Sequence, residues 1–231
     1  MTNGIRFIYF DLDDTLLDHR AAERSALADC TVHFEQHFNG HDLAHVQETY
    51  HAHNAPLWRA YGAGRIGRED LKRLRFARLL QALSIETVES EAVGAYYLQC
   101  YARHWSWTAG AETAFHALAD RFPVGILTNG FAEIQQAKLD RFPELRGRAA
   151  AIVISEEVGA MKPSPVLFAH ATEVVGVAPE QILYVGDSLH SDVEGGRDFG
   201  WQVAWYRGDA SVRDDVLVFD DWTALLVALE V

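Results

Sequence analysis

The sequence predicts an α/β protein in which a doubly wound parallel sheet carries an inserted, all-helical domain. Short apolar runs of strand length alternate with helical stretches through most of the chain, as in a parallel sheet with helices on its faces. One long segment between the first and second runs breaks this alternation and contains no convincing strand. A structureless connection of that length is rare inside a compact domain, so the segment is predicted to fold as a helical unit of its own.

Five apolar runs are predicted as the strands of the core sheet. Each run is short and ends at polar or turn-forming residues, as buried parallel strands do where they deliver side chains to a ligand site. The runs are Ile5–Phe10, Val124–Leu127, Ala151–Ile154, Ile182–Val185 and Gln202–Trp205. The helical stretches between and beside them are Ala111–Arg121, Ala132–Arg141, Pro165–Val175 and Ser191–Phe199.

The inserted segment is predicted to hold about four helices from its hydrophobic periodicity. One of them is Asp70–Leu83, where apolar side chains recur along one face, namely Phe76, Leu79, Leu80 and Leu83. We therefore expect an α/β core formed by residues 1–16 and 106–231, and a helical domain formed by residues 17–105.

Polar side chains follow the predicted strands at the edge where ligands of open parallel sheets bind. Carboxylates gathered there would repel one another at neutral pH, and a hard divalent cation relieves that repulsion. Mg²⁺ suits such a site because it prefers oxygen ligands and is usually held by one or two carboxylates and a substrate phosphate. A lysine, a hydroxyl and backbone N–H groups would hold the phosphate. The side chains are Asp11, Asp13, Thr128, Asn129, Lys162, Asp187 and Asp192.

Four motifs, in this order, resemble those of the haloacid dehalogenase superfamily of phosphohydrolases. They are Asp11–Leu16, Ile126–Gly130, Lys162–Pro163 and Gly186–Asp192. A single Asp-x-Asp carries little weight, whereas four ordered motifs across nearly the whole chain are specific. The resemblance implies a Rossmann-like core with a helical cap at residues 17–105, and the hydrolysis of phosphate monoesters in which Thr128, Asn129 and Lys162 bind the phosphate.

The same resemblance implies a role for each acidic residue. Asp11 attacks phosphorus and forms an aspartyl-phosphate, while Asp13 protonates the leaving oxygen and then activates the hydrolytic water. Mg²⁺ is held by Asp11, the backbone carbonyl of Asp13, and Asp187. Asp192 is implied to orient a metal-bound water or Lys162.

Longer stretches are similar to the pyrimidine 5′-nucleotidases of the YjjG/YfnB type. They are Asn54–Trp58 with Tyr61, Gly64 and Ile66; Thr128–Phe131 with Gln135 and Gln136; and Val153–Gly159 before Lys162–Pro163. The implied substrates are nucleoside 5′-monophosphates, especially pyrimidine and non-standard ones.

The side chains that would read the leaving group are expected at Asn54, Trp58, Tyr61 and Phe131. Trp58 and Tyr61 lie about one helical turn apart, and aromatic rings at that spacing more often belong to a core than to a substrate platform. Both interpretations stay open for these two rings, as they do for Asn54 and Arg65.

Competing functions use parts of the same site. Phosphoglycolate or sugar-phosphate hydrolysis is the first alternative, and a phosphomutase is a further one. A dehalogenase would use the same nucleophile but has no use for Asp13, because no leaving alkoxide needs a proton. A phospho-receiver signalling module, which is not an enzyme, also gathers acidic residues, Thr and Lys around Mg²⁺, but it carries no large cap.

The overall charge and composition of the chain limit the classes of molecule that it is expected to bind. The 231-residue chain has a formal net charge of −13 and no Lys/Arg-rich run, which argues against polymeric nucleic acid and anionic membrane surfaces. No apolar stretch approaches the ~20 residues of a membrane helix, and no signal-peptide pattern is present. We expect a cytoplasmic protein whose partner is a small phosphorylated metabolite.

Cysteine and histidine usage gives two smaller expectations. Cys30 and Cys100 are interpreted as reduced thiols without a catalytic role. Histidines recur every four residues from position 33 to position 45, a spacing that a zinc-binding helix face could use. Asn39–Gly40 interrupts this series as a helix stop, which favours an ordinary polar surface.

Overall fold

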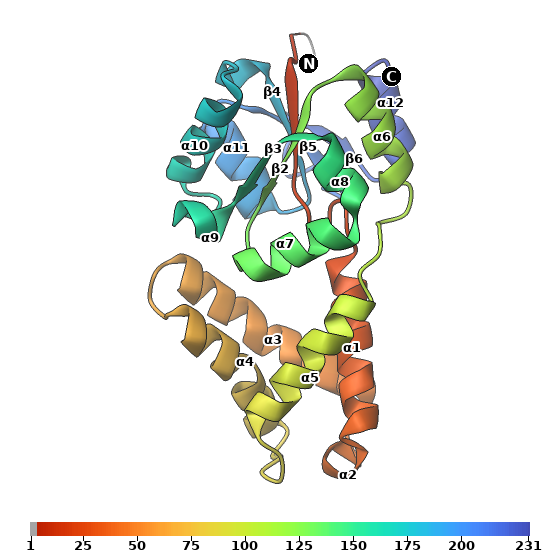
Figure 1. The fold of residues 1–231 in the computed structure, drawn as a ribbon, viewed down its shortest axis with the longest axis vertical. Helices are drawn as coiled ribbons and strands as arrows, with labels where there is room; N and C mark the ends of the chain where they lie inside the picture. Colours follow the sequence, from red (N-terminus) through yellow and green to blue (C-terminus); the bar gives the residue numbers. More distant parts are fainter. Residues whose placement is uncertain (1–3) are drawn as a thin grey trace. The chain divides into compact units, whose positions relative to one another are not determined.

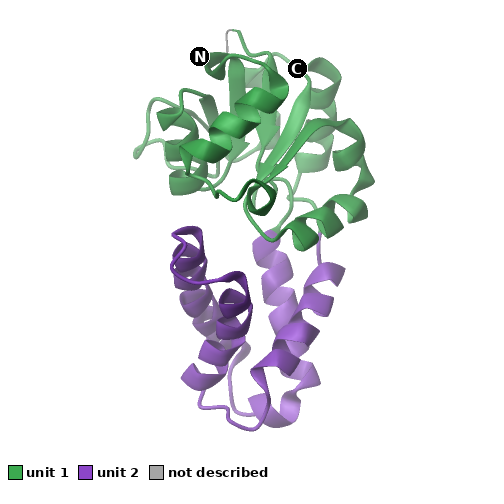
Figure 2. Cartoon of the chain, turned by 60° about the vertical axis from the view of Figure 1, so that its left-hand side comes forward, with its two compact units in different colours: residues 1–18, 106–231 green, residues 19–105 purple. Residues whose placement is uncertain are grey.

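The computed structural model describes residues 4–231, and the chain divides into two compact units. Unit 1 contains residues 1–18 and 106–231, and unit 2 contains residues 19–105 (Figure 2). The segments of unit 1 that flank unit 2 pair with each other. The Asp18 N–H donates to the Ser106 carbonyl at 2.9 Å, and the Thr108 N–H donates to the Leu16 carbonyl at 2.8 Å. The chain therefore leaves and re-enters the core at neighbouring points.

Unit 1 is built on a six-stranded sheet in the order β3-β2-β1-β4-β5-β6 (Figure 1). Every neighbouring pair of strands is parallel, and the strand order reverses between β1 and β4. The predicted doubly wound parallel sheet is thus confirmed. The strands are β1 (Phe7–Phe10), β2 (Val124–Thr128), β3 (Ala149–Ile154), β4 (Ile182–Gly186), β5 (Gln202–Tyr206) and β6 (Leu217–Phe219).

Helices cover both faces of this sheet, with α10 and α11 on one side and α6 and α12 on the other (Figure 1). The helices of unit 1 are α6 (Ala111–Arg121), α7 (Ala132–Arg141), α8 (Pro143–Arg148), α9 (Ser155–Val158), α10 (Pro165–Val175), α11 (Gly195–Asp198) and α12 (Trp222–Ala228), with short turns η1 (Pro179–Gln181) and η2 (Leu189–Glu194). The bounds of α6, α7 and α10 match the predicted helices.

The predicted helix Ser191–Phe199 is wrong in detail. The structure has a π-helical turn, η2, followed by the short α11. The Val193 N–H donates to the Ser188 carbonyl at 3.1 Å, five residues back, which widens the turn. The wider turn arises where Ser188 caps the segment by accepting a bond from the Ser191 N–H.

The core of unit 1 lies on both faces of the sheet because successive strand residues point to opposite sides. On one face the Tyr9 ring stacks on Trp201 with centroids 5.4 Å apart. On the other face the Phe10 ring meets Phe115 at 5.5 Å and Trp222 at 6.5 Å. All five rings are buried, and each contributes about 1.5–3 kcal/mol by leaving water.

Unit 2 is all-helical, as predicted. Its helices are α1 (His19–His33), α2 (Glu35–Phe38), α3 (Leu43–Gly62), α4 (Arg68–Ala82) and α5 (Ser90–Arg103). The predicted helix Asp70–Leu83 is confirmed as α4, with its predicted apolar face buried. The guanidinium of Arg75 is also buried and lies over the rings of Tyr50, Phe76 and Tyr97 at 5.4–5.9 Å. Within residues 4–231, no helix is both long and apolar enough to cross a membrane.

Among residues 4–231, the cysteines and histidines of unit 2 do not form a group that could hold a metal ion. Both cysteines are free and buried, and burial raises the pKa of the Cys30 thiol to about 12. The histidine series is divided between helices, with His33 at the end of α1 and His45 in α3. The His33 ring stacks on Tyr96 at 3.9 Å, and His37 bonds to Thr87 at 2.7 Å.

Candidate active site

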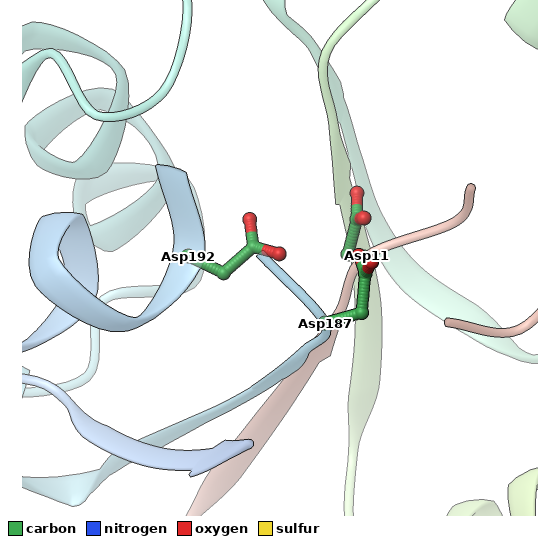
Figure 3. Close-up of side chains that lie close together, drawn as sticks. All are labelled: Asp11, Asp187 and Asp192. Atoms are coloured by element: carbon green, nitrogen blue, oxygen red, sulfur yellow. The ribbon is translucent and has the colours of Figure 1, made fainter. Parts of the chain in front are cut away.

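Three carboxylates gather at the carboxyl ends of β1 and β4, where the strand order reverses. Asp11 follows β1, Asp187 follows β4, and Asp192 approaches from η2 (Figure 3). One oxygen from each of them lies within 4.8 Å of the others. Because β1 and β4 are neighbours and parallel, the ends of these two strands bring together acidic residues 176 positions apart (187 − 11).

Asp192 reaches this group because the last residue of β4, Gly186, has no side chain to block it. The Asp192 carboxylate folds back over the end of β4, and one oxygen accepts the Ser188 N–H at 3.0 Å. A Cβ at Gly186 would lie 2.5 Å from that oxygen, so a larger residue there would displace the carboxylate. The spacing of the Gly186–Asp192 motif is therefore a packing requirement as well as a chemical one.

Lys162 joins two of these carboxylates. Its Nζ donates to Asp11 Oδ1 at 2.7 Å, lies 2.8 Å from Asp192 Oδ1, and lies 2.6 Å from the Tyr184 hydroxyl. The backbone of Lys162 is fixed by Asn129, whose side-chain amide donates to the Lys162 carbonyl at 3.1 Å and accepts the Lys162 N–H at 2.8 Å. Lys162 is thus fixed at its backbone by the loop after β2 and at its ammonium group by the side chains of the site.

Burial and mutual repulsion set the charge of the site. Burial and the neighbouring Asp192 raise the pKa of Asp11 to about 7, although the adjacent Lys162 ammonium acts to lower it. Burial, together with Asp192 and Asp11, raises the pKa of Asp187 to about 8. Burial alone would lower the pKa of Lys162, but Asp11 and Asp192 outweigh it and hold that pKa above its usual range. Lys162 stays charged, but its single positive charge does not balance the negative charge of three carboxylates.

This donor set fits a hard divalent cation. The gathered ligand atoms are all carboxylate oxygens, which Mg²⁺ prefers. The two oxygens of Asp192 already contact Lys162 and the Ser188 N–H. Asp11 and Asp187 are therefore the better candidates to hold the ion, and Asp192 is suited to hold Lys162.

The predicted phosphate loop begins at Thr128, the last residue of β2. The Thr128 hydroxyl is buried, accepts a bond from the Gln135 amide at 2.8 Å, and lies 3.3 Å from the Asn129 carbonyl. Because the Asn129 side chain is committed to the backbone of Lys162, the Asn129 contribution to phosphate binding would come from its backbone. The Gly130 N–H donates to Ser155 Oγ at 3.1 Å, which ties this loop to the end of β3.

Asp13 is placed beside α7 by contacts that the sequence did not suggest. Lys138 Nζ lies 2.5 and 2.8 Å from its two carboxylate oxygens, and Gln135 Nε2 donates to one of them at 2.9 Å. The only local signal was their spacing, since residues three apart share a helix face. Tyr184 was likewise missed, because a tyrosine inside an apolar strand is an ordinary core residue.

The candidates for reading the leaving group differ in exposure. Trp58 and Tyr61 are half-buried and meet edge to face with centroids 5.9 Å apart, while Arg65 is exposed. Asn54 is buried, and its amide oxygen has no hydrogen-bond partner among residues 4–231. Phe131 is buried at the residue that precedes α7.

The fold and the strand-end carboxylates define a doubly wound α/β protein with an acidic site where the strand order reverses. The family of haloacid dehalogenase-like hydrolases matches residues 5–200, and the chain belongs to this family.

Curated relatives align along most of their length. The chain is 31% identical over 200 residues to pyrimidine 5′-nucleotidase YjjG of Escherichia coli, covering 86% of this chain and 84% of that protein. It is 28% identical over 208 residues to pyrimidine 5′-nucleotidase PynA of Streptococcus pneumoniae, covering 87% and 84%. It is 27% identical to a glyceraldehyde 3-phosphate phosphatase of Pyrococcus furiosus, covering 88% and 81%.

Solved structures agree with this placement. The magnesium-bound crystal structure of the HAD-hydrolase YfnB from Bacillus subtilis superposes with a TM-score of 0.86 at 28% identity, covering 98% of this chain and 99% of that one. An L-2-haloacid dehalogenase from Xanthobacter autotrophicus gives a TM-score of 0.70 at 21% identity, which is a likeness of fold.

Proposed function

We propose that this protein is a Mg²⁺-dependent phosphomonoesterase that acts through an aspartyl-phosphate on Asp11, with a nucleoside 5′-monophosphate as substrate. The observation that carries the proposal is the contact between Asp11 and the buried Lys162 ammonium beside two further carboxylates. A nucleophile for phosphorus needs to be ionised and aimed, and Lys162 favours both.

The proposed reaction uses the residues at the strand ends. The Asp11 carboxylate attacks phosphorus, and the bond to the leaving oxygen breaks as Asp13 gives that oxygen its proton. Asp13 then takes a proton from the water that hydrolyses the aspartyl-phosphate and frees Asp11. Lys162 holds Asp11 in line, while the Thr128 hydroxyl and the backbone N–H of Asn129 bind the phosphoryl oxygens.

Asp11, Asp187 and the backbone carbonyl of Asp13 would hold the Mg²⁺. The ion would neutralise charge on the phosphoryl group, so that an anionic nucleophile can approach it. The support is the all-oxygen donor set and the raised pKa values of Asp11 and Asp187, both of which a cation would lower.

The substrate class rests on the relatives. Two of the aligned proteins are named pyrimidine 5′-nucleotidases, and alignments that cover 86% and 87% of this chain have to include most of the helical unit. We propose that this unit, residues 19–105, is the cap that selects the leaving group, since the strand-end residues account only for the phosphate. A sugar or triose phosphate is the second candidate substrate, because a glyceraldehyde 3-phosphate phosphatase aligns almost as completely.

The test is a panel of phosphate monoesters with released phosphate as the readout. We expect nucleoside 5′-monophosphates to give the highest kcat/KM, a chelator to stop turnover, and Mg²⁺ to restore it. Asp11→Asn should lower kcat by about 10³-fold or more while the protein stays folded, because an amide cannot attack phosphorus. Near-normal turnover by folded Asp11→Asn would refute the mechanism. A tenfold preference for sugar phosphates would refute only the nucleotide assignment.

A further inference from the structure

The carboxylate of Asp13 is gripped by a single face of α7. The Lys138 ammonium contacts both Asp13 oxygens at 2.5 and 2.8 Å, and the Gln135 amide contacts one of them at 2.9 Å. Lys138 is 2% exposed and Gln135 is 1% exposed, whereas the Asp13 side chain is 26% exposed. A buried cation and a buried amide therefore hold a carboxylate that still reaches the surface of the unit.

Gln135 also links Asp13 to the phosphate loop. Its Nε2 lies 2.9 Å from Asp13 Oδ2, 2.8 Å from the Thr128 hydroxyl and 2.9 Å from the Asn129 carbonyl. The Nε2 amide nitrogen has only two hydrogens, so the three acceptors share the hydrogens of this one NH₂ group. Gly130 makes the link possible, since a Cβ there would lie 3.0 Å from the same nitrogen.

Stability does not explain these polar groups. Burying a lysine costs several kcal/mol, and a buried ion pair often does no better than apolar side chains of the same volume. The Gln135 amide oxygen is also buried, and it has no hydrogen-bond partner within the described residues 4–231, which adds a desolvation cost of about 1–3 kcal/mol. An apolar face of α7 would serve the fold better, so the arrangement indicates a task at Asp13.

We propose that Lys138 and Gln135 are positioning residues that hold the Asp13 carboxyl group at the phosphate loop for proton transfer to the leaving oxygen. This inference rests on the function proposed above. The step itself moves one proton, which the Asp13 carboxyl group has taken from water before the substrate binds, to the bridging oxygen as the P–O bond breaks. It leaves the Asp13 carboxylate, the form that the Lys138 ammonium and the Gln135 amide stabilise. Fixing both oxygens of Asp13 removes its rotational freedom before the substrate arrives, and that orientation is what the two side chains contribute.

The leaving group distinguishes this role from a structural one. An alkoxide, such as the 5′-oxygen of a nucleoside, needs a proton to depart, whereas p-nitrophenolate departs without one. The measurement is release of the leaving group in the first turnover with enzyme in excess, which reports the attack by Asp11 and not the later hydrolysis. Uridine 5′-monophosphate and p-nitrophenyl phosphate are the two probes.

We expect Lys138→Met and Gln135→Leu to slow first-turnover release from uridine 5′-monophosphate by about 10–100-fold, a share of what general acid catalysis supplies. Release from p-nitrophenyl phosphate should change by about threefold or less, because its leaving group needs little proton transfer. Gln136→Leu is the matched control on the same helix, since Gln136 contacts Glu157 and Arg146 instead, and it should match wild type on both substrates.

A double-mutant cycle completes the test. In an Asp13→Asn background, Lys138→Met should have no further effect on uridine 5′-monophosphate, because its role acts through Asp13. Effects that multiply, or an equal slowing on both substrates, would overturn the inference. If Lys138→Met does not fold, Gln135→Leu carries the same comparison and the same cycle. A wild-type protein that releases phosphate from neither probe would instead overturn the proposed function.

Discussion

Asp11 is subject to opposing electrostatic effects that nearly balance. Burial and the neighbouring Asp192 favour its neutral form, while Lys162 at 2.7 Å favours the carboxylate, and the resulting pKa is about 7. Removing one partner of such a buried set shifts the balance by several kcal/mol, because the remaining charge is left uncompensated. Without a cation, Asp11 is therefore only partly ionised at neutral pH, and a bound divalent cation would favour its carboxylate form.

This balance predicts how stability depends on pH and metal. Asp11 and Asp187 have raised pKa values of about 7 and about 8 in the folded protein, while unfolded Asp titrates near 4. Between about pH 4 and pH 8 the folded state thus binds more protons than the unfolded state, so the stability of the metal-free protein falls as pH rises. Mg²⁺ binds the deprotonated carboxylates, so its stabilising effect should grow over the same range.

Thermal unfolding followed by circular dichroism checks this expectation. In excess chelator, Tm should fall from pH 5.5 to pH 8. The rise in Tm when a saturating concentration of Mg²⁺ replaces the chelator should be larger at pH 8. The Asp187→Asn protein is the control, because it should lose most of the response to Mg²⁺. A metal effect of equal size at both pH values would contradict the assignment of these carboxylates.

At the scale of elements, the junction between β4 and η2 builds much of the site. The strand delivers Asp187, and the π-helical turn returns Asp192 to the end of the same strand, where it contacts Lys162. The turn lies tightly against the strand, with Gly186 as the point of contact. π-helical turns are uncommon and are often found at functional sites.

Gly186→Ala should therefore damage the site more than the fold. The added Cβ would lie 2.5–2.7 Å from the Asp192 side chain, which has to move away from Lys162. We expect kcat to fall about tenfold or more, because Lys162 loses one of the partners that aim it. Gly147→Ala in α8 is the control, since a Cβ there meets nothing within 4 Å. Equal activity in the two variants would contradict the packing requirement.

The order of elements explains how much of the protein could be predicted. The three helices predicted with their observed bounds have regular periodicity, and the site residues at the strand ends follow from parallel topology. By contrast, β6 is only three residues long and its first two residues are half-buried, so it lacks the pattern of a core strand. Lys138 and Tyr184 have ordinary local patterns, and only the tertiary structure brings them to Asp13 and Lys162.

At the scale of the whole molecule, two units divide the proposed task. Unit 1 holds every residue that we assign to the phosphate, and unit 2 is proposed to select the leaving group. Trp58 and Tyr61 on α3 are half-buried rings with the chemistry to stack on a base. Base stacking on an aromatic ring contributes about 1–3 kcal/mol where proteins bind single-stranded nucleic acids.

Trp58→Ala and Tyr61→Ala test this division. Each should raise KM for uridine 5′-monophosphate by about 5–150-fold, the equivalent of one stacking contact, and change KM for p-nitrophenyl phosphate far less. Steady-state kinetics on both substrates, with Tm as the control for folding, provide the measurement. An equal rise in both KM values together with a lower Tm would show instead that the rings are core residues of unit 2.

The pairing of Asp18 with Ser106 and of Leu16 with Thr108 means that the helical unit is inserted between two adjacent, hydrogen-bonded positions. A tight turn could join those positions without disturbing any strand of the sheet. A different insert could do so too, because the cost of closing a longer segment grows only slowly with its length. Gain, loss or replacement of the helical unit is thus a local event in the history of such a chain. Enzymes with one inherited chemistry can in this way acquire new substrates by exchanging a module.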